Sequence, residues 1–172
     1  MVFIDESGFR LLPMVVRTWA VRGQTPTLRA PLSWGHLAVI GALTDEGKLY
    51  TQVQRRGFRA TDIIRFLRYL LRCLPGKLLL IWDGLPAHRS KRVKAFVAQE
   101  SNARLEVWAL PAYAPDLNPI EGVWSYLKCV MLPNLCAPTL NQLNQHLRRS
   151  LRLLRTQPSL LATYLRQPAI YL

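Results

Sequence analysis

Acidic residues are scarce in this sequence, and so are cysteines and long apolar runs. Aspartate and glutamate number 10 among 172 residues, and none follows Glu121. The 3 cysteines form no CxxC pair, which argues against a disulfide framework or a zinc ribbon and leaves reduced thiols as the expectation. The apolar runs are far shorter than the roughly 20 residues of a membrane span. Acidic residues at positions 5 and 6 are unlike a secretory signal, so a cytoplasmic protein is expected.

The composition is otherwise that of one folded domain with a large excess of positive charge. Half of the residues are apolar, which is enough for a core in a chain of this length. The 23 basic residues outnumber the acidic ones to give a net charge of +13, and 18 of the 23 are arginines. Arginine binds phosphate oxygens in pairs, so this excess favours a nucleic-acid partner over a merely basic composition.

The order of patterns along the chain predicts a mixed sheet. Short apolar or β-branched runs bounded by turn residues indicate strands, and apolar spacing of three and four indicates helices. The tryptophans fall mostly in apolar segments and are expected in the core. Three antiparallel strands followed by strand–helix–strand units predict an α/β domain with helices on both faces of the sheet. The strands are expected at residues 2–4, 18–21, 36–43, 48–53, 78–82 and 105–110, and the helices at 60–74, 90–99, from 118 onward and at 140–154.

Three of the acidic residues stand where a catalytic site would need them. Asp5 ends the first expected strand, and Asp83 ends the apolar run at residues 78–82, which is expected to be buried. Glu121 lies in the first turn of the helix opened by Asn118 and Pro119. In open α/β sheets the sites form outside the carboxyl ends of the strands. Two carboxylates at the ends of neighbouring parallel strands would face each other, and a third on a packed helix would close the cluster.

Carboxylates in one place repel each other unless a cation joins them. Oxygen ligands without a nearby His or Cys set favour Mg²⁺ or Mn²⁺. Two such ions stabilise the attacking and leaving oxygens of phosphoryl transfer. The sequence therefore indicates a metal-dependent nuclease or strand-transfer enzyme.

Each of these acids also has an ordinary structural interpretation. Asp5 can open a turn, and Asp83 followed by Gly84 is a common turn dipeptide. Glu121 lies three residues after Asn118, an arrangement typical of a capping box. The three placements together favour the catalytic interpretation over three separate structural ones.

Several basic side chains are expected to contact DNA. His88 follows Asp83 by five residues, and could touch phosphate, move a proton or hold local structure. Lys128 shares a helix face with Glu121 and could neutralise a phosphate beside the metal site or simply face solvent. The C-terminal helix carries a phosphate-binding group of arginines: Arg148, Arg149, Arg152 and Arg155.

Three motifs resemble the catalytic blocks of a known family. Residues 80–88 (LIWDGLPAH) resemble the second block of the DDE transposases of the insertion-sequence 630 and Tc1/mariner superfamily. Residues 113–121 (YAPDLNPIE), with Trp124 and Lys128 after them, resemble the third block, and residues 3–9 (FIDESGF) resemble the first. Residues 19–26 also resemble the segment that follows the first block. The resemblance runs from residue 1 to about residue 130.

The resemblance implies an RNase H-like fold, with a five-stranded mixed sheet of three antiparallel and then two parallel strands, flanked by helices. It implies that Asp5, Asp83 and Glu121 bind two Mg²⁺ or Mn²⁺ ions, that DNA is hydrolysed at transposon ends, and that the freed 3′-hydroxyl attacks target DNA. The chain departs from the family pattern at Gly84, where an asparagine is usual. The 37 residues between Asp83 and Glu121 are slightly more than in eukaryotic relatives.

The resemblance also sets expectations for domains and partners. Residues 1–130 are the expected catalytic domain and residues 131–172 a basic helical extension of it. The helix-turn-helix modules of the family are not found before the first block, so a separately encoded helix-turn-helix partner is a further expectation. The expected partners are transposon ends, target DNA and further copies of the chain, in a prokaryotic cytoplasm at the nucleoid. The alternatives are a nuclease without strand transfer and an inactive DNA-binding remnant.

Overall fold

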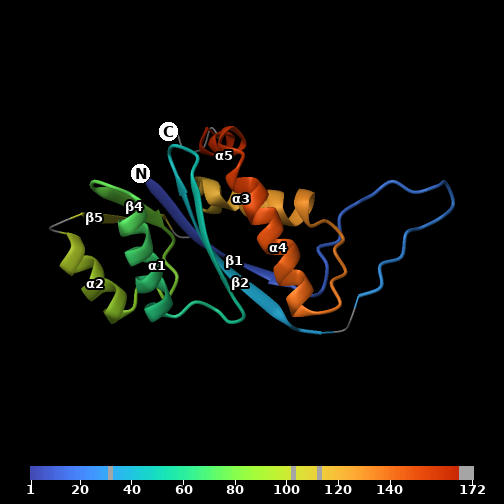
Figure 1. The fold of residues 1–172 in the computed structure, drawn as a ribbon, viewed down its shortest axis with the longest axis horizontal. Helices are drawn as coiled ribbons and strands as arrows, with labels where there is room; N and C mark the ends of the chain where they lie inside the picture. The colour runs from blue at the N-terminus through green and yellow to red at the C-terminus, as the bar shows by residue number, and fades with distance from the viewer. Residues whose placement is uncertain (31–32, 102–103, 112–113, 167–172) are drawn as a thin grey trace.

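The computed structural model of the chain describes residues 1–172 except 31–32, 102–103, 112–113 and 167–172 (Figure 1). Among the described residues, no helix is both long and apolar enough to span a bilayer. The elements are, in chain order, β1 (Val2–Arg10), β2 (His36–Thr44), β3 (Leu49–Gln54), α1 (Ala60–Cys73), β4 (Leu78–Trp82), α2 (Lys91–Ser101), β5 (Leu105–Ala109), the 3₁₀ helix η1 (Pro115–Leu117), α3 (Pro119–Tyr126), the π-helix η2 (Leu127–Met131), α4 (Leu140–Arg155) and α5 (Pro158–Leu165).

The strands form one five-stranded sheet in the order β3-β2-β1-β4-β5. The hairpin β2–β3 and the pair β1–β2 are antiparallel, while β4 runs parallel to β1 and β5 parallel to β4. This is the mixed sheet that the order of sequence patterns predicts. The central strand is β1, which is antiparallel to one neighbour and parallel to the other.

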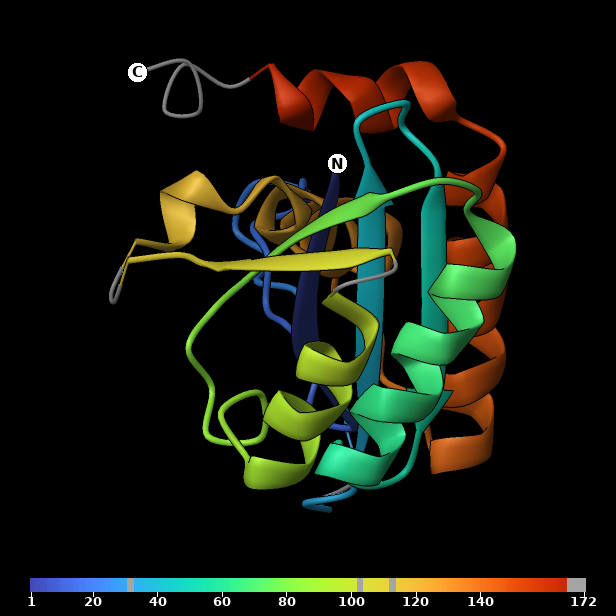
Figure 2. The same ribbon diagram turned by 90° about the vertical axis from the view of Figure 1, so that its left-hand side faces the viewer.

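Helices cover both faces of the sheet because each strand places alternate apolar side chains on opposite sides. On one face Val2 and Ile4 pack with α1 and α2, for example against Phe66. On the other face α3, α4 and α5 share a second core, in which Leu147 of α4 and Leu161 of α5 are fully buried. In Figure 1 β1 and β2 run between α1 with α2 on the left and α4 on the right, and Figure 2 shows α5 across the β2–β3 turn.

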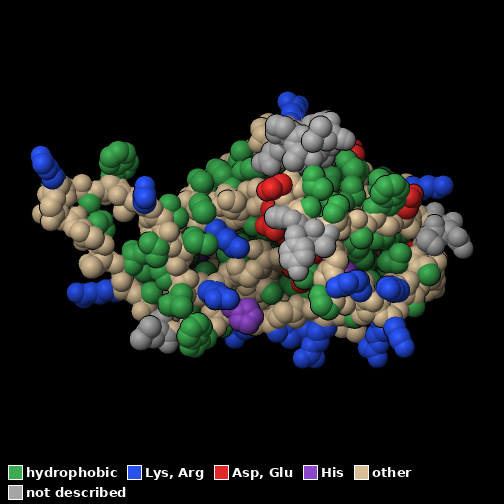
Figure 3. All heavy atoms as spheres, turned by 180° about the vertical axis from the view of Figure 1, so that it is seen from behind, with side chains coloured by type: hydrophobic (Ala, Val, Ile, Leu, Met, Phe, Trp, Pro, Cys, Tyr) green, Lys and Arg blue, Asp and Glu red, His purple; other side chains and the backbone are tan. Residues whose placement is uncertain are grey.

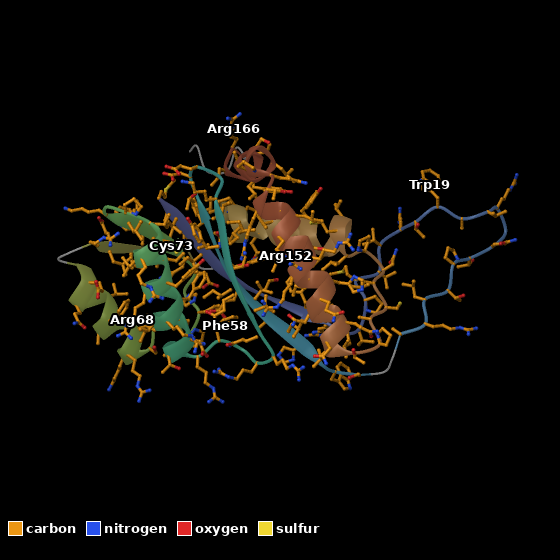
Figure 4. All side chains as sticks on the ribbon, in the orientation of Figure 1. Trp19, Phe58, Arg68, Cys73, Arg152 and Arg166 are labelled. Carbon is orange, nitrogen blue, oxygen red and sulfur yellow. The ribbon has the colours of Figure 1, made fainter. Side chains whose placement is uncertain are left out.

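The segment between β1 and β2 differs from the prediction. Residues 18–21 form no strand and belong instead to an arm (residues 12–30 and 33–35) that projects away from the sheet (Figure 1). An extended segment forms a strand only beside another strand that satisfies its backbone hydrogen bonds, and none of the described strands pairs with residues 18–21. Trp19, at the outer part of the arm in Figure 4, is 99% exposed, and Trp34 is 82% exposed. The expectation that most tryptophans are buried is therefore wrong: it holds for Trp82 and Trp124, but not for the two in the arm or for Trp108 of β5, which is 62% exposed.

Helix α3 lies unusually close to the sheet because β2 carries a glycine beneath it. A Cβ atom at Gly41 would stand 2.5 Å from the Trp124 ring and 2.9 Å from the Ile120 side chain. Gly41 is paired in register with Asp5 of β1. The missing side chain therefore leaves room for the Trp124 ring directly beside the carboxylate.

Replacing Gly41 by alanine should push Trp124 away from the sheet. Neither contact atom belongs to a freely movable side chain, because both Trp124 and Ile120 are fully buried. We expect Gly41→Ala to lower the free energy of unfolding by about 1–3 kcal/mol, as overpacking of cores does, in urea denaturation. Gly57→Ala is the control, since nothing lies within 4 Å of a Cβ there, and should change stability by less than about 0.5 kcal/mol. Equal stability of the two variants would contradict the close approach.

Candidate active site

Asp5 and Asp83 lie side by side because of the register of the two parallel strands. The pairing of β1 with β4 ends at Ile4 and Trp82, so the next residue of each chain segment is a carboxylate. Asp5 does not end its strand, as the sequence suggested, because β1 continues to Arg10 against β2. It stands instead one residue beyond the last pair of the parallel β1–β4 ladder, just as Asp83 follows the end of β4. The side-chain juxtaposition follows from the register, although the strand boundary was predicted wrongly.

Glu121 joins these two carboxylates from α3. The helix begins at Pro119, and Glu121 lies in its first turn as predicted. All three carboxylates line one cavity of about 660 Å³, which Arg89 and Asn118 also border. Viewed from behind in Figure 3, acidic side chains gather near the middle of the surface, with lysines and arginines mainly below them and on the arm. The structure thus brings the three sequence-predicted residues to one site.

The carboxyl group of Asp5 is buried, and its pKa is raised. Burial, and after it the negative charge of Glu121, raises the pKa of Asp5 to about 7. The Trp124 indole Nε1 donates a buried hydrogen bond of 2.8 Å to Asp5 Oδ2 and partly offsets this effect. Without a cation, Asp5 is therefore about half protonated near neutral pH.

Asp83 is held by His88, which is itself buried. Its ring Nδ1 lies 2.9 Å from Asp83 Oδ1 and its Nε2 lies 3.3 Å from Glu6 Oε1. The imidazole also stacks on the Trp82 ring, with centroids 4.3 Å apart. The imidazole thus connects carboxylates that come from β1 and from the end of β4.

These contacts keep both partners charged. Burial alone would lower the pKa of His88, but the hydrogen bonds with Asp83 and Glu6 outweigh it and raise its pKa to about 9. Burial would likewise raise the pKa of Asp83, but the His88 hydrogen bond and the Leu85 backbone N–H outweigh it, and the pKa is lowered. The side chain of His88 has no exposed surface, so its geometry suits orientation of Asp83 better than contact with DNA phosphate.

The donors around the cavity fit a hard divalent cation by their chemistry. They are carboxylate oxygens that share one cavity and influence each other's charge, with no sulfur ligand among them. Within the described residues, no three His, Cys, Asp or Glu side chains are already gathered closely enough to hold an ion. Asp5 and Asp83 are instead engaged by Trp124 and His88. The donor residues needed for a hard cation are present around one cavity.

The other predicted basic residues lie away from this cavity. Lys128 is in η2 with its ammonium 5.5 Å from the centre of the Phe9 ring, and it borders a different cavity with Arg10. Three of the four predicted arginines of α4 line a cavity of about 390 Å³ beside Thr51 of the edge strand β3. These are Arg148, Arg152 and Arg155, and Arg152 is labelled in Figure 4. In the sheet, β2 lies between β3 and β1, which carries Asp5, and β4 lies beyond β1.

Sequence reasoning missed the residues that hold the carboxylates in place. Glu6 is one of these residues and is not among the sequence-predicted site residues. It follows Asp5 directly, so its side chain lies on the opposite face of β1. The sequence places Trp124 in the core but does not predict its hydrogen bond to Asp5. The available signal was its position three residues after Glu121, which places both on one side of α3.

Comparison with known proteins gives one family and several solved structures. A family model described as DDE superfamily endonuclease matches residues 1–144. Comparison with curated protein sequences gives no match. The mariner Mos1 paired-end complex with Mg is similar at a TM-score of 0.70 and 16% identity, over 99% of this chain and 54% of that one.

Two further structures extend this comparison. The Mos1 strand transfer complex has a TM-score of 0.64 and 16% identity, over 94% of this chain and 53% of that one. The chain thus spans about half the length of the Mos1 chains in these complexes. The catalytic domain of Mos1 mariner transposase has a TM-score of 0.54 and 12% identity, over 94% of this chain and 80% of that one. These likenesses concern the fold, which is the RNase H-like sheet that the sequence motifs imply.

The raised pKa of Asp5 predicts how stability changes with pH when no divalent ion is present. Its pKa is 3.8 in the unfolded chain and about 7 in the folded one, so the folded state binds more protons between these values. Stability should therefore fall as pH rises from about 4 to 7, by at most about 4 kcal/mol for a shift of this size. Urea denaturation in EDTA at several pH values measures it.

Asp5→Asn is the matched variant, because its amide keeps an acceptor for Trp124 and cannot ionise. It should match wild type near pH 4.5 and be more stable at pH 8. His88 also loses its proton as pH rises, but it does so in both proteins. Parallel stability curves for wild type and Asp5→Asn would contradict the assignment.

Proposed function

The chain belongs to the DDE superfamily endonucleases, and we propose that it is the catalytic part of a DNA transposase. In this proposal it hydrolyses phosphodiester bonds at transposon ends and joins the freed 3′-hydroxyl to target DNA. The observation that carries the proposal is the convergence of Asp5, Asp83 and Glu121 on one cavity at the end of the parallel strands. The fold likeness to Mos1 complexes, which contain transposon ends, supports it.

The three carboxylates would hold two Mg²⁺ or Mn²⁺ ions. When bound, such ions lower the pKa of an attacking water or 3′-hydroxyl and stabilise the leaving oxygen. The chain's own residues orient this donor set: Trp124 fixes Asp5 through its indole N–H, and His88 fixes Asp83 through Nδ1. Solved Mos1 paired-end complexes with Mn and with Mg support the choice of ions.

Contacts to DNA phosphates are proposed for the basic residues around and beyond the site. The arginine groove between α4 and β3 suits a phosphodiester backbone, because arginine binds phosphate in a bidentate manner. Lys128 is a further proposed phosphate contact at a separate cavity beside Phe9 and Arg10. His88, whose side chain is buried, is proposed to orient Asp83 instead. The phosphate contacts carry no direct sequence information. We therefore propose that end recognition comes from a helix-turn-helix module outside residues 1–172.

The proposal also covers the domain limits, the cellular location and the oligomeric state of the chain. Residues 1–130 act as the catalytic domain, and residues 131–172 extend it through α4 and α5, which share its second core. The chain works at the nucleoid in a prokaryotic cytoplasm, and as a dimer or higher oligomer on two transposon ends.

Asp5→Asn, Asp83→Asn and Glu121→Gln should each abolish DNA cleavage while leaving DNA binding nearly unchanged. Loss of one carboxylate removes the ion clamp from the transition state. Nicking of supercoiled plasmid measures cleavage, and a gel shift measures binding. Mg²⁺ or Mn²⁺ should support nicking and EDTA should stop it, while Ca²⁺ supports binding alone. Cleavage within tenfold of wild type in any variant would remove that residue from the site.

Strand transfer needs its own measurement, because a nuclease would pass the plasmid test. A pre-cut duplex with a free 3′-hydroxyl end should become joined to plasmid DNA in the presence of Mg²⁺. Cleavage without joining would favour the nuclease alternative. Metal-independent binding with neither reaction would favour the inactive remnant.

Replacing the four α4 arginines Arg148, Arg149, Arg152 and Arg155 by alanine should weaken the salt dependence of DNA binding. Each lost phosphate contact lowers the slope of log K against log salt by about 0.9, so four contacts lower it by nearly four. Binding of end and scrambled duplexes at several salt concentrations measures the slope. Arg72→Ala with Arg92→Ala, on the opposite face of the sheet, is the charge control. Because the control removes two charges rather than four, a slope change half as large as that of the α4 variant would show that only net charge matters.

A further inference from the structure

Asn118 occupies the N-cap position of α3 without capping it. Asparagine is among the best N-cap residues because its side-chain oxygen accepts a hydrogen bond from a backbone N–H of the first turn. Here the Asn118 side chain makes no such bond, and only its backbone oxygen accepts from the Glu121 N–H, at 3.0 Å. Asn118 and Glu121 therefore do not form the capping box that their spacing suggests. The side-chain oxygen is therefore available to bind another group.

The Asn118 side-chain oxygen is buried and has no hydrogen-bond partner. The residue is only 5% exposed, and Oδ1 is the one buried side-chain nitrogen or oxygen without a partner among the described residues. An unsatisfied buried polar atom costs about 1–3 kcal/mol. Native structures seldom keep such a group unless a ligand, an ion or a water completes it.

The surroundings of Asn118 point to a cation as the missing partner. The residue lines the same cavity as Asp5, Asp83 and Glu121, whose ionised oxygens accept hydrogen bonds and cannot donate them. The two ring donors nearest these carboxylates are already used, Trp124 Nε1 by Asp5 and His88 Nδ1 by Asp83. A hard divalent cation binds carboxylate and amide oxygens alike.

We propose that the Asn118 Oδ1 atom is a fourth oxygen ligand of the divalent-cation site formed by Asp5, Asp83 and Glu121. The inference rests on the proposed function and adds a residue to its site. An amide oxygen adds a ligand without adding a fourth negative charge to a cavity where three carboxylates already repel one another. It also explains why the best N-cap residue is placed at the start of α3 and is not used as a cap.

The test measures Mn²⁺ binding to the purified chain, by electron paramagnetic resonance and by the shift of the melting temperature on adding Mn²⁺. Asn118→Leu has a similar volume and no polar atom, so it should weaken Mn²⁺ binding by about 10–100-fold, as loss of a supporting group at metal sites does. In EDTA the same variant should be as stable as wild type or more stable, because the unsatisfied oxygen is gone. Asn118→Asp keeps an oxygen at the position and should bind Mn²⁺ more tightly than Asn118→Leu.

Two reference variants separate the outcomes. Asn141→Leu, at an exposed asparagine of α4, should leave Mn²⁺ binding unchanged. If Asp5→Asn abolishes binding while Asn118→Leu leaves it within threefold of wild type, the role of Asn118 is wrong and the carboxylate site stands. If Asp5→Asn has no effect, the proposed metal site itself is wrong. If Asn118→Leu does not fold, Asn118→Ala and Asn118→Asp decide by the same comparison.

Discussion

The hydrogen bond from Trp124 to Asp5 connects the helix that carries Glu121 with the central strand of the sheet. It is buried and 2.8 Å long, and it joins residues 119 positions apart in the chain. Gly41 makes it geometrically feasible, because any side chain there would occupy the space of the indole ring. The distance of α3 from β1, and with it the position of Glu121 relative to Asp5, therefore depends on a polar contact between an indole and a carboxylate.

The charge of the molecule is divided between two regions. The few acids include a group of three around one cavity, while arginines line a separate groove at the edge strand β3. A polyanion would be attracted to the basic surface and repelled by the carboxylates unless cations neutralised them. In the proposed function, DNA binding near the cavity would therefore be favoured by bound metal ions, although different residues are proposed for the two tasks.

Much of the fold and the three carboxylates were predictable from the sequence, because both rest on local patterns. Strand β4 was predicted with its observed bounds at Leu78–Trp82, and the helix that starts at Pro119 follows from Asn118 and Pro119. The prediction of a strand at 18–21 failed because a β-type pattern carries no information about whether a neighbour is available. The contacts of Trp124 with Asp5 and of His88 with Glu6 were beyond reach for a related reason. They join residues more than 80 positions apart, and only the register of β1 with β2 and β4 brings them together.

The absence of a side chain at Gly41 has a genetic consequence. Every change at the first or second base of a glycine codon replaces the residue, and every replacement adds at least a Cβ atom 2.5 Å from the Trp124 ring. A copy of this gene under no selection would therefore accumulate destabilising mutations at a codon that encodes none of the three carboxylates. Decaying copies are then expected to include chains destabilised by a change at position 41, and the encoded polypeptide would keep its acidic motifs intact.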